Sequence, residues 1–150
     1  MQIQVEKFRN CMKQMNEIIE EYFAKTVGGD GMPPLDMAWE VFTELEASDK
    51  MILITARNES DNKLLAFVTY YLLFNQNHKT IPMAACGTLA TRLDYRGQGI
   101  AGKLLHTAEA VLRMYDVKQI VHGHRSVYDV EPVFTKHGYK AIEVMYMKEL

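Results

Sequence analysis

The spacing of apolar positions changes several times along this 150-residue chain, and each change marks an expected element. Over 8–23 the apolar residues recur every three or four positions, which predicts an amphipathic helix. The same spacing returns over 35–45 and again over 99–115. Between the first two segments, the run VGGDGMPP (27–34) combines three glycines with two prolines, which favours a loop.

Other segments have the alternating or continuous apolar pattern that is typical of strands. They cover residues 2–7, 51–58, 64–74, 80–91 and 117–124. Short polar turns join the middle three, so we expect these to be antiparallel neighbours. A short helix over 131–137, ended by Gly138, and a closing strand or strand pair from Tyr139 complete the chain. The order β-α-α-β-β-β-α-β-α-β predicts one mixed α/β (α+β) domain over residues 1–150.

Composition narrows the class of protein. Apolar residues make up 48% and charged residues 24%, which is typical of a soluble domain, and the net charge is −2. That balance argues against general affinity for nucleic acid or for an anionic membrane. The longest apolar run (64–74) is shorter than the roughly 20 residues of a membrane helix. Two cysteines without close spacing favour a reducing compartment, so we expect a cytoplasmic protein.

The stretch DYRGQGIAGKLL (94–105) carries three overlapping signatures for binding phosphate. They are G-x-G-x-x-G at Gly97, Gly99 and Gly102, G-x-x-x-x-G-K at Gly97, Gly102 and Lys103, and R-x-x-G-x-A at Arg96, Gly99 and Ala101. A predicted strand precedes the stretch and a predicted helix follows it. Glycines and a helix N-terminus together bring unpaired N–H groups to an anion, so we expect an anion site here.

Two of the three signatures lack a necessary partner. A P-loop needs a Ser or Thr hydroxyl for Mg²⁺ after its lysine, and this chain has Leu104 there. A dinucleotide fingerprint needs a parallel βαβ unit and a carboxylate about 20 residues further on. Antiparallel strands are expected before the loop instead, and Val121 and His122 lie at that distance. R-x-x-G-x-A therefore remains.

The run LATRLDYRGQGIAGKLL (89–105) resembles the coenzyme A motif of the GNAT superfamily of acyl-CoA-dependent N-acyltransferases. VFTKHGYK (133–140) is similar to a late segment of the same family, and the element order matches its fold. The resemblance implies a GNAT-like domain that uses acetyl-CoA as co-substrate. It also implies a small-molecule or protein amine as acceptor, and a homodimer is one assembly that it allows.

The resemblance also implies where acetyl-CoA would bind. The strands over 80–91 and 117–124 would part, and the pantetheine arm would lie between them. Its hydrogen bonds would go to the backbone of Leu89, Ala90 and Thr91. The pyrophosphate would be wrapped by the loop and helix start, at Arg96, Gly97, Gln98, Gly99, Ile100, Ala101, Gly102 and Lys103.

Acetyl transfer to an amine requires a base, and HGHR (122–125) is the richest stretch for one. His122 and His124 lie on one face of their predicted strand because side chains alternate along it. By the resemblance, His122 falls where some family members carry a catalytic glutamate. Two ordinary polar residues at a strand end are the alternative interpretation. An H-x-H metal pair is disfavoured without carboxylate or cysteine partners, so we expect no metal.

The acid and the acceptor are less determined by the sequence. Phe134 stands where the family usually has a tyrosine, so Tyr128, Tyr139 or water would have to protonate the departing thiolate. The missing tyrosine leaves open a module that binds coenzyme A or a partner protein without turnover. Four acidic residues of the first two helices and their loop could attract a cationic amine, although we favour a solvated surface; they are Glu20, Glu21, Asp30 and Asp36.

Overall fold

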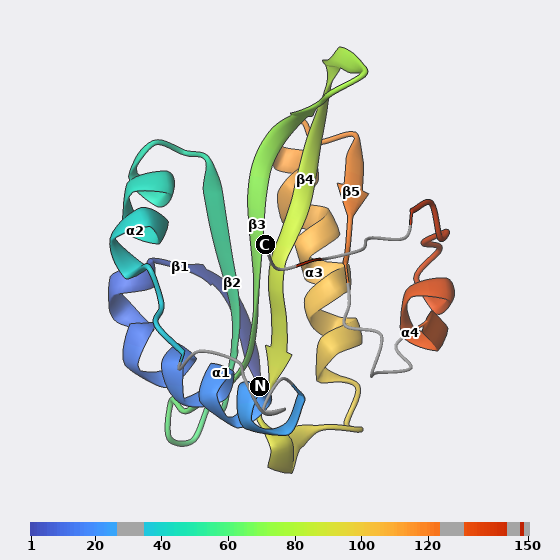
Figure 1. Cartoon of the computed structure of the whole chain (residues 1–150). Helices are drawn as coiled ribbons and strands as arrows, with labels where there is room; N and C mark the ends of the chain where they lie inside the picture. Colours follow the sequence, from blue (N-terminus) through green and yellow to red (C-terminus); the bar gives the residue numbers. More distant parts are fainter. Residues whose placement is uncertain (27–34, 124–130, 144–147, 149–150) are drawn as a thin grey trace.

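The computed structural model describes residues 1–26, 35–123, 131–143 and 148. The helices are α1 (Met12–Thr26), α2 (Trp39–Ala47), α3 (Ile100–Met114) and α4 (Glu131–Lys136), with 3₁₀ turns at Phe8–Asn10 and Leu93–Tyr95. The strands are β1 (Gln2–Glu6), β2 (Met51–Arg57), β3 (Leu64–Asn75), β4 (His78–Thr91) and β5 (Gln119–Val121). Figure 1 shows these elements arranged around one central sheet.

Within the described residues the strands form one sheet in the order β1-β2-β3-β4-β5. β1 through β4 pair antiparallel, whereas β5 runs parallel to β4. The hairpin of β3 and β4 is long, and its tip projects beyond the rest of the molecule (Figure 1). The expected mixed, mostly antiparallel sheet is therefore confirmed.

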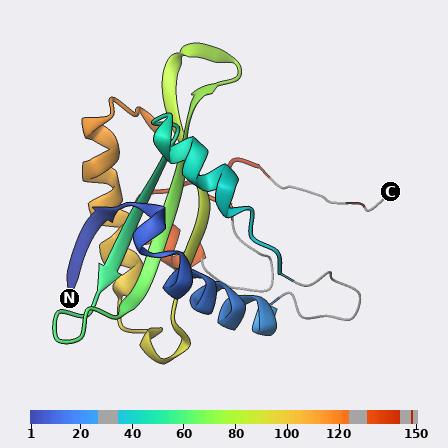
Figure 2. The same ribbon diagram turned by 90° about the vertical axis from the view of Figure 1, so that its left-hand side faces the viewer.

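Helices cover both faces of the sheet. α1 and α2 lie on one face and α3 on the other, as the two perpendicular views show (Figures 1 and 2). Two apolar clusters fill the layers: one joins Val68 and Tyr70 of β3 to α3, and the other joins Phe67 to α1 and to the side chains of α2. This arrangement explains the continuous apolar pattern of β3, because its side chains alternate between two faces that are both buried.

The expected elements differ from the observed ones mainly near the chain ends. The first helix is divided, since a 3₁₀ turn precedes α1 at Met12. The strand expected over 117–124 covers only Gln119–Val121. Residues 139–143 of the expected closing strand are not in a strand, and most of its remainder lies outside the described residues. The loop expected over 27–34 lies outside them too.

None of the helices in the described part of the chain combines the length and apolar character that crossing a bilayer requires.

The β1–β2 edge of the sheet contains a buried ion pair. The Glu6 carboxylate accepts hydrogen bonds from Arg57 Nε at 2.5 Å and Nη2 at 3.0 Å. Thr55 Oγ1 at 2.6 Å and Cys11 Sγ at 3.0 Å also donate to it. Burial by itself would raise the pKa of Glu6, but these donors, Arg57 first, lower it to about 2. The pair therefore stays ionised inside the fold.

Candidate active site

β4 and β5 part after three residue pairs. Pairing runs from Met83 opposite Gln119 to Ala85 opposite Val121, and β5 ends there. β4 continues to Thr91, still paired on its other side with β3. Along the described residues, the second half of β4 therefore has no strand on its β5 side. This is the parting that the sequence led us to expect.

A bulge at Gly87 coincides with the parting. Thr69 of β3 lies opposite Thr88, and Tyr70 lies opposite Cys86, so Gly87 is an extra residue in β4. A Cβ at Gly87 would lie 2.8 Å from Thr69 Oγ1, closer than real side chains approach. A bulge bends its strand and increases the twist, which accounts for the divergence of β4 from β5.

Backbone groups of β4 point into the parting in a fixed alternation. The N–H groups of Thr88 and Arg92 both donate toward β3, each at 2.9 Å. Because successive residues of a strand point their N–H and C=O groups to opposite sides, those of Leu89 and Thr91 point to the open side. The Thr91 carbonyl accepts a hydrogen bond from Arg96 Nε at 3.2 Å. Leu89 therefore offers a donor and an acceptor beside the parting.

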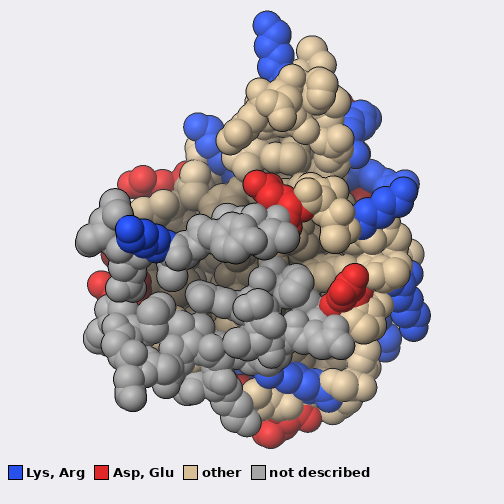
Figure 3. Space-filling view, turned by 45° about the vertical axis from the view of Figure 1, so that its right-hand side comes forward, with Lys and Arg blue, Asp and Glu red and all other residues tan. Residues whose placement is uncertain are grey.

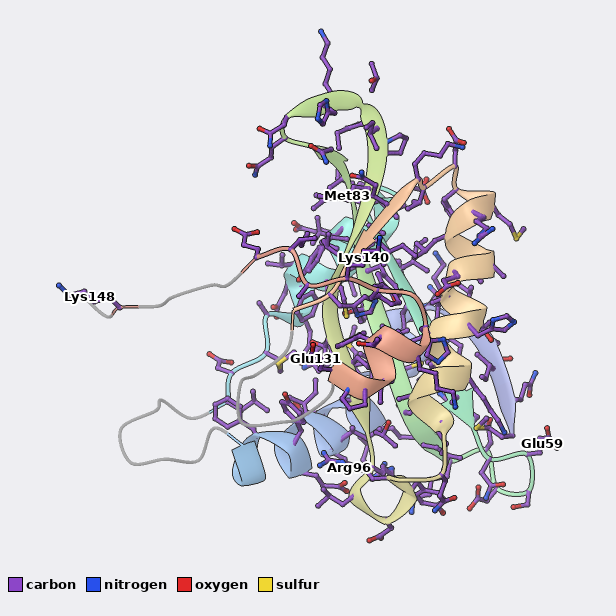
Figure 4. All side chains as sticks on the ribbon, turned by 90° about the vertical axis from the view of Figure 1, so that its right-hand side faces the viewer. Glu59, Met83, Arg96, Glu131, Lys140 and Lys148 are labelled. Carbon is purple, nitrogen blue, oxygen red and sulfur yellow. The ribbon has the colours of Figure 1, made fainter. Side chains whose placement is uncertain are left out.

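The glycine loop leads from this opening into the N-terminus of α3. Gly97 and Gly99 have φ of +74° and +73°, in the left-handed region that favours glycine. Gly99 is the N-cap residue of α3 and supplies no side-chain cap, and the first turn holds no acidic residue. The first N–H groups of α3 thus remain available to an anion. Figure 4 shows Arg96 beside this loop, at the end of the sheet away from the hairpin tip.

The side chains predicted around the pyrophosphate have different roles in the structure. Ile100 is buried and anchors the first turn of α3 in the core. Gln98 donates to the Asp94 carbonyl at 3.2 Å, which braces the loop internally. Lys103 is exposed. Gly102 allows the side chain of His137, which follows α4, to approach α3 closely, because a Cβ there would lie 3.0 Å from His137 Nε2.

His122 follows β5 directly and lies at the start of the parting. Its Nε2 shares a hydrogen bond with the Tyr70 hydroxyl of β3, at 3.0 Å. The imidazole also contacts the rings of Phe134 and Tyr139, each with centroids 5.0 Å away. Within the part of the chain that the structure describes, the buried His122 Nδ1 and Tyr139 hydroxyl have no hydrogen-bond partner. Two unsatisfied polar atoms thus lie in one aromatic cluster.

Burial keeps the titratable groups of this cluster uncharged at neutral pH. It lowers the pKa of His122 to about 4. It raises the pKa of Tyr139 to about 12, with a smaller contribution from Glu109, and raises the pKa of Tyr70 as well. Burial also raises the pKa of the Cys86 thiol to about 12, which makes it a poor nucleophile.

The other predicted residues either lie away from the gap between β4 and β5 or fall outside the described residues. His124, Tyr128 and Asp30 lie outside the described residues. Glu20 accepts a hydrogen bond from Asn16 at 2.6 Å on the surface of α1. The solvated surface that we favoured for Glu21 is wrong, because this carboxylate accepts a hydrogen bond from Arg92 at 3.1 Å. Among the described residues, no cluster of three His, Cys, Asp or Glu side chains could hold a metal ion.

Sequence reasoning missed three residues of the site: Tyr70, Gly87 and Arg92. Gly87 had a readable signal, since an isolated glycine inside a strand pattern suggests a bulge. Tyr70 lies in an apolar run that shows only that it is buried, and Arg92 precedes the R-x-x-G-x-A signature that begins at Arg96. Their partners lie far away in the sequence, so the pattern gave no pairing.

Two hollows adjoin the cluster and the parting. One of about 550 Å³ is open and lies between the second half of α3 and the segment His137–Tyr139. Its lining includes Glu109, Arg113 and Lys118. The other, of about 20 Å³, lies under α2 and reaches Thr88 beside the bulge. On the surface, Lys and Arg side chains gather along one edge of the space-filling view (Figure 3).

Comparison with known proteins agrees with this geometry. The model of the acetyltransferase (GNAT) family matches residues 12–139. A glucosamine-6-phosphate N-acetyltransferase from Arabidopsis thaliana superimposes with a TM-score of 0.76 at 10% identity, over 99% of this chain and 97% of that one. A search of curated proteins found no match.

Two further solved structures have the same fold. One is an aminoglycoside acetyltransferase from an uncultured soil metagenomic sample, with a TM-score of 0.74 at 18% identity over 99% of this chain and 95% of that one. The other is a ribosomal-protein-alanine N-acetyltransferase from Brucella melitensis, with a TM-score of 0.72 at 16% identity over the whole of both chains. At these identities the likeness concerns the fold, and the acceptors of these proteins differ from one another.

Proposed function

Because this chain belongs to the acetyltransferase (GNAT) family, we propose that it transfers an acetyl group from acetyl-CoA to a primary amine by direct attack. One observation carries the proposal: the bulge at Gly87 opens β4 from β5, and the opening leads to the glycine loop of α3. An unpaired strand edge that ends at an anion site suits a ligand with an amide-containing arm and a diphosphate. Acetyl-CoA has both.

In this proposal the pantetheine arm bonds to the backbone of Leu89 and lies along Ala90 and Thr91. The N–H groups from Gly97 to Gly102 bind the diphosphate, and the α3 dipole favours its charge. Lys103 adds positive charge from the exposed side of the first turn. The unpartnered Nδ1 of His122 and hydroxyl of Tyr139 supply polar atoms for the thioester end.

The reaction needs no covalent enzyme intermediate. The neutral amine nitrogen attacks the thioester carbon and forms the C–N bond, which gives a tetrahedral intermediate. The C–S bond breaks when this intermediate collapses. The nitrogen loses one proton and the departing thiolate gains one. The oxygen of that intermediate becomes negative and requires a donor, and the Leu89 N–H on the open side of β4 is the donor in this proposal.

His122 suits hydrogen bonding better than proton abstraction. With a pKa of about 4, its imidazole takes a proton only weakly from an ammonium, whose pKa is about 10. Tyr70 holds the ring through Nε2, so in this proposal Nδ1 is the nitrogen left to hydrogen-bond with the ligand. The base role expected for His122 stays a prediction, and solvent is the alternative acceptor of the amine proton.

Thiol release from acetyl-CoA in the presence of a panel of amines tests the function. Sugar amines, aminoglycosides, aromatic amines and peptides with free N-termini cover the acceptor chemistry. We expect at least one class to stimulate release, and we expect His122→Gln to lower the rate without weakening coenzyme A binding more than a few-fold.

A module that binds coenzyme A without turnover is the second candidate. Phe134 at the usual tyrosine position and the low pKa of His122 favour it. Coenzyme A binding by calorimetry without amine-stimulated thiol release would establish this alternative. Absence of coenzyme A binding would overturn both candidates.

A further inference from the structure

Arg92 joins the end of β4 to the glycine loop, and its side chain is almost entirely buried, at 7% exposure for the residue. Its Nε donates to the Leu64 carbonyl of β3 at 2.7 Å. Its other two nitrogens reach α1, with Nη2 2.6 Å from Glu17 Oε2 and Nη1 3.1 Å from Glu21 Oε1. All of the guanidinium nitrogens are therefore engaged between β3 and α1.

The backbone next to Arg92 is held to the same two elements. The Arg92 N–H donates to a β3 carbonyl at 2.9 Å. The following N–H, of Leu93, donates to Glu21 Oε2 at 3.3 Å. Glu21 thus binds both the guanidinium and the first residue of the 3₁₀ turn. The start of the loop cannot shift without breaking contacts to α1.

Local hydrogen bonds extend this anchor toward the anion site. The Tyr95 N–H donates to the Arg92 carbonyl at 3.0 Å, and the Arg96 N–H donates to the Leu93 carbonyl at 3.2 Å. Gln98 then donates to the Asp94 carbonyl at 3.2 Å. The loop is therefore braced from Arg92 as far as Gln98, next to the glycines that would face the diphosphate.

The chain contains a second buried arginine that makes a similar set of contacts. Arg57, at 4% exposure, binds the Glu6 carboxylate and donates to the Asn62 carbonyl at 2.7 Å. Its partners lie at the β1–β2 edge, away from the glycine loop. Comparing variants of the two arginines therefore distinguishes the effect of a buried ion pair on stability from its effect on the conformation of the glycine loop.

We propose that Arg92, held by Glu17 and Glu21, is a positioning residue that places the glycine loop for coenzyme A. This inference rests on the proposed function, because it assigns coenzyme A to that loop. It also makes α1 part of the structure that sets cofactor affinity, through Glu17 and Glu21. An arginine is required at this position because its planar guanidinium donates hydrogen bonds to three acceptors at once, which a lysine ammonium does not match in geometry.

The experiment compares Arg92→Met with Arg57→Met. Coenzyme A affinity is measured by calorimetry, well below the unfolding midpoint of each variant, and stability is measured by urea unfolding. We expect both variants to lose stability, whereas only Arg92→Met weakens coenzyme A binding, by about tenfold. The diphosphate-bearing fragment adenosine 3′-phosphate 5′-diphosphate should lose affinity by the same factor, because in this proposal the loop binds that half of coenzyme A.

A milder pair of variants covers the case in which either methionine variant does not fold. Glu21→Gln weakens the hold on both Arg92 and Leu93, whereas Glu46→Gln alters a carboxylate that accepts the Phe8 N–H at 3.0 Å in another part of the fold. We expect Glu21→Gln to weaken coenzyme A binding about threefold and Glu46→Gln to leave it unchanged. Arg92→Lys should recover only part of the affinity lost in Arg92→Met.

The outcomes are distinguishable. Equal affinity in wild type, Arg92→Met and Glu21→Gln overturns the positioning role and leaves the proposed function intact. Equal weakening in the Arg57 and Arg92 variants also overturns it, because general destabilisation then explains the loss. A wild-type protein that does not bind coenzyme A overturns both proposals.

Discussion

At the β1–β2 edge of the sheet, the Glu6 carboxylate has several side-chain donors, whereas at the β4–β5 edge two buried polar atoms have no partner among the described residues. Both regions take titratable groups out of water, which carries a free-energy cost unless hydrogen bonds replace those lost to solvent. The first region meets that requirement internally. The second, with His122 Nδ1 and the Tyr139 hydroxyl, leaves it unmet.

The difference separates stability from ligand binding. The groups of the Glu6–Arg57 ion pair already make their hydrogen bonds within the protein, so they are not available to a ligand. Loss of either partner should instead destabilise the fold strongly. Unpartnered atoms beside a strand parting lower stability slightly in the free protein. A bound molecule can form hydrogen bonds with these atoms, and buried polar atoms without partners therefore indicate a candidate binding site.

Glu6→Gln should have the largest effect on stability. The substitution leaves the Arg57 guanidinium buried without its counter-charge, at a cost of about 3 kcal/mol in the free energy of unfolding. Urea unfolding measures it. Glu59→Gln is the control, since Glu59 pairs with the N-terminal ammonium but is 68% exposed, and should change stability by less than about 0.5 kcal/mol. Similar losses in the two variants would remove the distinction between the regions.

The same carboxylate makes stability depend on pH. The pKa of Glu6 is lowered from 4.5 to about 2 by folding, so its ionised form stabilises the native state fully above pH 4.5. That contribution is lost as the pH falls from 4.5 toward 2. Glu6→Gln should abolish this part of the acid-induced loss, and a parallel pH dependence in wild type and variant would contradict the assignment.

Gly99→Glu should have the largest effect on coenzyme A binding. A side chain at φ of +73° costs about 1–2 kcal/mol, and a carboxylate at the anion site adds about 1 kcal/mol of repulsion. Together these predict an affinity loss of about a hundredfold by calorimetry. Gly99→Ala carries the strain without the charge and should lose about tenfold. If the two variants bind equally, the loop does not receive an anion.

Phe134→Tyr should raise turnover by about tenfold if the departing thiolate lacks a proton donor. The new hydroxyl would extend from a ring that already contacts His122. The quantity to measure is kcat with the best amine of the panel. Phe74→Tyr is the control, because Phe74 is 66% exposed in the β3–β4 hairpin and lies away from the cluster. An unchanged kcat in a folded Phe134→Tyr protein would show that thiolate protonation does not limit the reaction.

The sequence allowed the fold to be predicted wherever a segment carried a long periodic pattern. α3 was predicted over 99–115 and spans Ile100–Met114, and β3 was predicted to within one residue of its end. β5 was predicted too long, because its pairing with β4 stops at Val121, where the two strands part. The hydrophobic pattern of a strand indicates which residues are buried, but it does not indicate where pairing with a neighbouring strand ends.

The glycine loop could be read from the sequence because its function depends on local backbone geometry. Gly97 and Gly99 adopt positive φ, a conformation that glycine favours. The contacts of Tyr70 with His122 and of Arg92 with Glu21 join residues 52 and 71 positions apart. Such contacts depend on how elements pack, so one sequence gives no signal for them.

Tyr139→Phe should have the smallest effect on stability. Comparison with Tyr70→Phe distinguishes a hydroxyl without a partner from one that is hydrogen-bonded. It removes a hydroxyl that has no partner in the free protein, so stability should stay equal or rise by up to about 1 kcal/mol. Tyr70→Phe removes the partner of His122 Nε2 and should cost about 1 kcal/mol. With saturating acetyl-CoA, the Tyr139→Phe protein should gain less stability than wild type, because one contact to the ligand is missing. Equal stabilisation of Tyr139→Phe and wild type by acetyl-CoA would place the Tyr139 hydroxyl outside the site and leave His122 Nδ1 as its unpartnered atom.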